Sequence, residues 1–138
     1  MPRLIRALTR NRAFTDPESP DPRLRGRDYP VPFSQVWEAA LETARAWPRW
    51  TVTAAEARRG EIEVEARTAL WRFVDDVWIR ISLDALGQTR VDVSSQSRVG
   101  RADLGVNARR IARFLHALDA RVLPGERGGK TRKSFQQR

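Results

Sequence analysis

The spacing of the apolar residues changes twice along this chain, and these changes limit the folds that it can adopt. Between residues 34 and 47 apolar side chains such as Leu41 and Ala44 recur every three or four positions, which is the period of an amphipathic helix. From residue 50 to residue 95 the period is two, as in a strand with one buried face. Helical spacing returns up to residue 122. The predicted order is therefore helix, strands, helix.

Local signals place the ends of the two helices. Ser34 is a good N-cap directly after Pro32-Phe33, and Pro48 ends the first helix near Trp47. The last helix is expected to begin at Asp103 or Asn107 and to end at about Val122.

Four strands are predicted between the helices. They cover residues 50–54, 61–67, 71–83 and 89–95. Because short turns separate them, they form an antiparallel meander. Each strand has one apolar face, so both helices are expected to pack on that face. This gives an α+β fold, a two-layer sandwich whose other sheet face is exposed to water.

The two ends of the chain differ from the middle. Six of the eight prolines fall in the first 32 residues, and proline cannot propagate a helix or a central strand. We therefore expect residues 1–28 to be a flexible N-terminal arm and residues 29–123 to be a single α+β domain. Residues 124–138 are basic and lack apolar periodicity, so we expect a disordered tail.

The charge of the chain suggests only a weak attraction to anions. The formal net charge is +9, but residues 31–123 carry 14 basic and 12 acidic side chains, so most of the excess lies in the termini. Arginine accounts for all but two of the 26 basic residues. We expect a weak, sequence-independent attraction to polyanions or anionic membranes through these termini.

Composition also excludes several classes of function. The chain has no cysteine and one histidine, so thiolate chemistry and multi-histidine metal sites are excluded, and we predict no metal and no cofactor. No run approaches the length of a transmembrane segment. The expected location is the cytoplasm, either free or peripheral to the membrane.

The most unusual stretch leads from the fourth strand into the last helix. Residues 94–111 read SSQSRVGRADLGVNARRI, and residues 73–77 on the third strand read FVDDV. Together they resemble the bacterial family known as Domain of Unknown Function 1499, whose pattern is similar to S-x-S-R-x-G-x-x-D-x-G-x-N-x-x-R-I after an F-x-D-D-V strand. The resemblance covers about residues 29–118. It implies no activity, because none is established for the family.

The chain departs from this family in two ways. Members often look membrane-anchored, whereas this chain has no hydrophobic anchor, and Ser94 stands where an arginine is common. The candidate binding or structural residues of the motif are Asp75, Asp76, Ser97, Arg98, Gly100, Arg101, Asp103, Gly105, Asn107 and Arg110.

These residues admit a structural interpretation. Gly100 and Gly105 permit backbone conformations closed to other residues, and Asp103 or Asn107 caps the last helix. In the same interpretation, Arg98 pairs with the neighbouring acids Asp75 and Asp76.

They also admit a functional interpretation. Ser97, Arg98 and Arg101 precede a helix N-terminus, which favours anions, and Arg109 and Arg110 follow one turn into the helix. The loop from Ser97 to Asn107 is then the candidate site for an anionic ligand or a protein partner.

Other candidate groups carry less weight. Asp75 and Asp76 are neighbours on a strand, so their side chains point to opposite faces and do not form a catalytic pair. The sequence around His116 shows no Ser or Asp signature of nucleophilic catalysis. Trp78 points outward beside Arg80. RNA-binding sheets stack bases on several aromatic side chains, so one exposed aromatic is weak support for RNA binding. No catalytic residue is therefore assigned.

We favour a non-enzymatic binding or accessory module. The first alternative is a peripheral membrane protein held by its basic termini, since Leu4, Ile5 and Leu8 alternate with arginines at the N-terminus. The second is an enzyme of unknown class, which a solvent-accessible pocket holding Asp75, Asp76 and Arg98 would favour.

Overall fold

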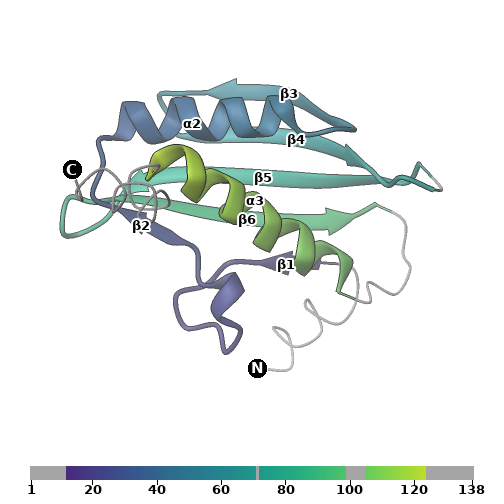
Figure 1. Cartoon of the computed structure of the whole chain (residues 1–138), viewed down its shortest axis with the longest axis horizontal. Helices are drawn as coiled ribbons and strands as arrows, with labels where there is room; N and C mark the ends of the chain where they lie inside the picture. Colours follow the sequence, from purple (N-terminus) through teal and green to yellow (C-terminus); the bar gives the residue numbers. More distant parts are fainter. Residues whose placement is uncertain (1–11, 71, 99–104, 124–138) are drawn as a thin grey trace, which may run out of the picture.

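The computed structural model describes residues 12–70, 72–98 and 105–123 (Figure 1). Its elements are β1 (Arg12–Phe14), η1 (Pro22–Leu24), β2 (Arg27–Tyr29), α2 (Phe33–Ala46), β3 (Trp50–Glu56), β4 (Glu61–Arg67), β5 (Val74–Leu83), β6 (Thr89–Ser97) and α3 (Val106–Val122). The predicted tail, residues 124–138, lies outside the described residues.

The fold is α+β, with an antiparallel sheet and both α-helices on the same face of it (Figure 1). The strand order is β1-β6-β5-β4-β3, and β2 also pairs with β6. The class, the meander from β3 to β6 and the flanking helices agree with the sequence analysis.

The predicted count of four strands is wrong, because the described residues form six. The two additional strands come from the segment expected to be an arm. β1 pairs with β6 through Arg12 opposite Gln96, and β2 pairs with it through Arg27 opposite Val91. Each has only three residues, which is too few to show an alternating pattern. Pairing with β6, rather than local sequence, defines them.

The helix starts also differ from the prediction. α2 begins at Phe33 with Pro32 as its N-cap, so Ser34 lies inside the helix. The carbonyl of Pro32 accepts hydrogen bonds from the backbone N–H groups of Gln35 and Val36, at 3.1 and 3.2 Å. α3 begins after Gly105, whose φ of 82° is left-handed. Gly105 therefore has the special conformation predicted for it, and Asn107 is not the cap.

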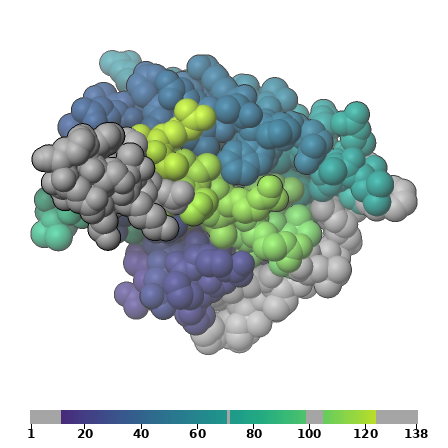
Figure 2. All heavy atoms as spheres, viewed as in Figure 1, coloured from purple at the N-terminus to yellow at the C-terminus, as the bar shows by residue number. Residues whose placement is uncertain are grey.

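The core lies between the sheet and the two helices. The inward residues of β4 are Ile62, Val64 and Ala66, each at most 2% exposed, as their alternation predicted. The space-filling view in Figure 2 shows α2 and α3 side by side over this layer, with the segment from β1 to η1 packed against α3. On the opposite face Trp78 is 42% exposed, as predicted. The sheet therefore has one covered face and one open face.

Candidate anion-binding pocket

Three residues of the long motif join the end of β6 to the first turn of α3. Ser95 and Ser97 lie on the inward face of β6 and are buried, as is Asn107. The Ser95 hydroxyl donates to Asn107 Oδ1 at 2.6 Å, and Asn107 Nδ2 donates to the Ser97 hydroxyl at 3.1 Å. Since buried polar groups need partners, these bonds fix the start of α3 against the sheet.

The same network holds Arg110. Its Nη1 donates to Asn107 Oδ1 at 2.8 Å and to the Ser95 hydroxyl at 3.1 Å, and lies 2.9 Å from Asp75 Oδ2. The Asp75 side chain is fully buried, and that of Arg110 is 13% exposed. An ion pair in this environment is costly to break, because the remaining charge would be buried without its partner. The network therefore fixes the position of the Arg110 guanidinium.

Arg98 lies on the other face of the sheet. Its Nε and Nη2 donate to Asp76 Oδ2 and Oδ1 at 2.9 and 2.8 Å, and Nη2 also donates to Glu65 Oε2 at 2.8 Å. These hydrogen bonds, to Asp76 and then to Glu65, raise the pKa of Arg98 above its ordinary value. The predicted contact of Arg98 with Asp76 is present, but Asp75 faces the helices and pairs with Arg110 instead.

The arrangement thus separates the candidate residues. Asp76 and Arg98 lie on the open sheet face, so they do not share a pocket with Asp75. Gly100, Arg101 and Asp103 lie outside the described residues. Ser97 is the last residue of β6 rather than part of a loop.

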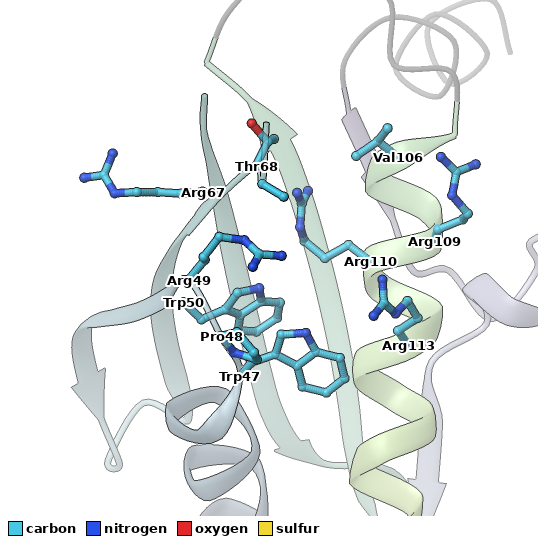
Figure 3. Close-up of a pocket in the computed structure, with 11 residues that line it drawn as sticks. Trp47, Pro48, Arg49, Trp50, Arg67, Thr68, Val106, Arg109, Arg110 and Arg113 are labelled. Atoms are coloured by element: carbon cyan, nitrogen blue, oxygen red, sulfur yellow. The ribbon is translucent and has the colours of Figure 1, made fainter. Parts of the chain in front are cut away.

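A pocket of about 240 Å³ opens beside Arg110 (Figure 3). It is bounded by the corner between α2 and β3, the end of β4 and the first turns of α3. Its lining residues are Trp47, Pro48, Arg49, Trp50, Arg67, Thr68, Ala69, Val106, Arg109, Arg110 and Arg113. Among these described lining residues five are arginines and none is acidic. Figure 3 shows Arg49 and Arg110 reaching into the space between the sheet and α3, whereas Arg67 points away from it.

Aromatic rings form the inner end of the pocket. The rings of Trp47 and Trp50 have centroids 5.8 Å apart and an interplanar angle of 34°. Trp50 stacks on the buried ring of Phe114, with centroids 5.7 Å apart. The Arg113 guanidinium lies 5.9 Å from the centroid of a Trp47 ring, a cation–π distance. The core residue Phe114 therefore supports the aromatic end of the pocket.

Arg49 has an unusual backbone conformation. Its φ is 64°, in the left-handed region, and its carbonyl accepts a hydrogen bond from the N–H of Arg67 at 2.9 Å. A non-glycine residue in this region costs about 1–2 kcal/mol. Strain of this kind is often found at binding sites. The corner between α2 and β3 thus directs an arginine into the pocket at an energetic cost.

This chemistry suits the binding of an anion. Guanidinium groups bind phosphate and carboxylate groups through paired, charge-assisted hydrogen bonds. In the described part of the chain, no group of three or more His, Asp or Glu side chains could hold a metal ion. None of the described helices is long and apolar enough to cross a bilayer.

Sequence reasoning located the support of this pocket better than its lining. Of the predicted residues, Arg110 lines the pocket, and Asp75, Ser97 and Asn107 belong to the network behind it. The Trp47–Trp50 corner was missed. Its signal was the sequence Trp-Pro-Arg-Trp, in which two aromatics and an arginine surround the proline that ends α2.

Comparison with known proteins gives one family match. A family model described as "Protein of unknown function (DUF1499)" matches residues 5–118. A solved crystal structure, that of TTHA0849 from Thermus thermophilus, is 15% identical, with a TM-score of 0.36, over 83% of this chain and 97% of that chain. The comparison with curated proteins finds no match. The family match extends into the N-terminal segment that contributes β1 and β2.

Proposed function

The chain belongs to the DUF1499 family, whose description names no activity, and we propose from the geometry that it is a binding module for a small anion. The anionic group, a phosphate or a carboxylate, binds in the pocket between the α2–β3 corner and α3. The observation that carries this proposal is one pocket of about 240 Å³ that is lined by arginines, two of which, Arg49 and Arg110, reach into it (Figure 3).

Repulsion among these arginines favours an anionic ligand. Like charges gathered around one pocket repel one another. Asp75 compensates for Arg110 from behind, but no carboxylate is among the described residues that line the pocket. A bound anion lowers this repulsion and gains hydrogen bonds to guanidinium groups.

The support of Arg110 favours tight binding. A side chain already held in place loses little conformational entropy when the ligand arrives. Arg110 is held by Asp75, Ser95 and Asn107. It therefore offers an ordered guanidinium. Arg49 reaches into the same pocket from the opposite side (Figure 3).

The test is calorimetric titration of the full chain with inorganic phosphate at low and moderate ionic strength. We expect saturable binding that Arg49→Gln and Arg113→Gln each weaken by about 10-fold, the value of one charge-assisted hydrogen bond. Arg80→Gln is the matched control, because it removes the same charge from the open face of the sheet.

Equal weakening by the Arg80 control would show that binding follows net charge and would overturn the proposal. Absence of saturable binding of any anion to the unmodified chain would also overturn it.

A further inference from the structure

We propose that the anionic group bound here is carried by a single flat aromatic ring, so that the ligand is an aryl phosphate or an aromatic carboxylate. This inference rests on the proposed function and narrows its ligand class. It follows from the division of one pocket into an arginine end and a tryptophan end.

The two ends lie next to each other. The indoles of Trp47 and Trp50 lie beneath the guanidinium groups of Arg49 and Arg110 in Figure 3. Both tryptophans are only partly buried, and both line the cavity. A ligand whose anionic group contacts the arginines therefore brings its other atoms against indole surface.

The geometry of the indoles favours a ring over an aliphatic chain. Trp50 is backed by Phe114 at an interplanar angle of 15°, and Trp47 is tilted from Trp50 by 34°. Aromatic pairs prefer offset or tilted arrangements with centroids about 4.5–7 Å apart. A flat ring in the pocket extends a series that already runs from Phe114 to Trp50 and Trp47. A planar guanidinium such as that of Arg49 also stacks well on an aromatic face.

The size of the pocket suits a ligand with one ring. Pockets for drug-sized ligands have volumes of about 300–1,000 Å³, and this one has about 240 Å³. One ring with one anionic group matches this volume better than a dinucleotide does.

The test compares four probes by calorimetry on the full chain: inorganic phosphate, phenyl phosphate, cyclohexyl phosphate and benzoate. We expect phenyl phosphate to bind about 2- to 10-fold more tightly than cyclohexyl phosphate, the range typical of one aromatic contact. Benzoate shows whether the anionic group must be a phosphate or can be a carboxylate.

The variant Trp47→Leu keeps an apolar side chain and removes the ring. It leaves Trp50 on Phe114, so the core contact is preserved. We expect this variant to bind phenyl and cyclohexyl phosphate with equal affinity. Trp78→Leu makes the same change at the exposed tryptophan of the open face and should leave the preference intact.

Three outcomes would overturn this inference. Equal affinity for the two organic phosphates would leave only the anion site, without a preference for a ring. Loss of affinity for all probes in Trp47→Leu would mean that the ring supports the pocket rather than recognising a ligand. If none of the four probes binds to the unmodified chain, the proposed function itself fails.

Discussion

The guanidinium of Arg110 lies 2.9 Å from the carboxylate of Asp75, whose side chain is fully buried beneath α3. The next residue, Asp76, points to the opposite side of β5 and binds Arg98 on the open face of the sheet. Two adjacent acids of one motif therefore have different surroundings and different partners.

This difference predicts unequal effects of the same substitution. Asp75→Asn removes the carboxylate that pairs with the mostly buried Arg110, so we expect a loss of about 3–5 kcal/mol in the free energy of unfolding. Asp76→Asn affects an exposed pair, and its urea midpoint should stay close to that of the unmodified chain. Urea denaturation of both variants measures the contrast. Equal midpoints for the two variants would refute the role assigned to Asp75.

The left-handed backbone at Arg49 predicts a variant that gains stability and loses binding. Arg49 and Arg72 are the non-glycine residues with positive φ in the described chain, at 64° and 61°. Replacing either with glycine should add about 0.5–1 kcal/mol to the free energy of unfolding, since strain is relieved but the unfolded chain gains freedom. Only Arg49→Gly should weaken phosphate binding, because Arg72 is not among the residues that line the pocket. Denaturation and calorimetry on the two variants check both parts, and weaker binding in Arg72→Gly would contradict the second.

The turn between β3 and β4 predicts a strong effect of one methyl group. A Cβ at Gly60 would clash with the carbonyl oxygen of Ile81, whereas a Cβ at Gly87 would meet nothing within 4 Å. Both glycines have positive φ, so alanine costs about 1–2 kcal/mol of strain at either position. Gly60→Ala should lose roughly 1–3 kcal/mol more, because the backbone must shift. Thermal or urea unfolding compares the two variants. Comparable losses of stability would show that the close approach of Gly60 to Ile81 is not required.

The single tyrosine of the chain predicts a loss of stability in alkali. Burial, together with the hydrogen bond from the Tyr29 hydroxyl to Asp119 at 2.5 Å, raises the pKa of Tyr29 above its ordinary value. Above about pH 10 the unfolded chain loses this proton while the folded chain keeps it. The free energy of unfolding should therefore fall as the pH rises, by up to about 1.4 kcal/mol per pH unit.

Because the sequence has one tyrosine, phenolate absorbance follows Tyr29 alone. We expect it to stay low in the folded protein at a pH where urea-unfolded protein is ionised. Tyr29→Phe should remove this part of the pH dependence. An ordinary titration curve in the folded state would show that the hydroxyl is accessible.

The sequence predicted those elements that are long enough to show a period. β4, with Ile62 and Val64 facing inward, and the last helix are examples. β1 and β2 could not be predicted, because three residues carry no periodic signal and their pairing depends on β6, at least 60 residues away.

The candidate site was predictable in the same partial way. The motif brought Arg110 and Asn107 to attention because they are close in sequence to Ser97. Trp47 and Arg49 come about 60 residues earlier and reach the pocket because α2 packs beside α3. Their proximity to Arg110 results from helix packing, which the spacing of residues within a single segment does not reveal.

The pairing of Arg12 with Gln96 has a consequence for synthesis on the ribosome. At about 5–20 residues per second, β1 is made several seconds before β6 exists. During that interval its backbone has no native partner, and unpaired strands are prone to aggregate. The shortness of β1 and the nearby prolines reduce this risk while the chain grows. β1 thus joins the sheet only after β6 has been translated.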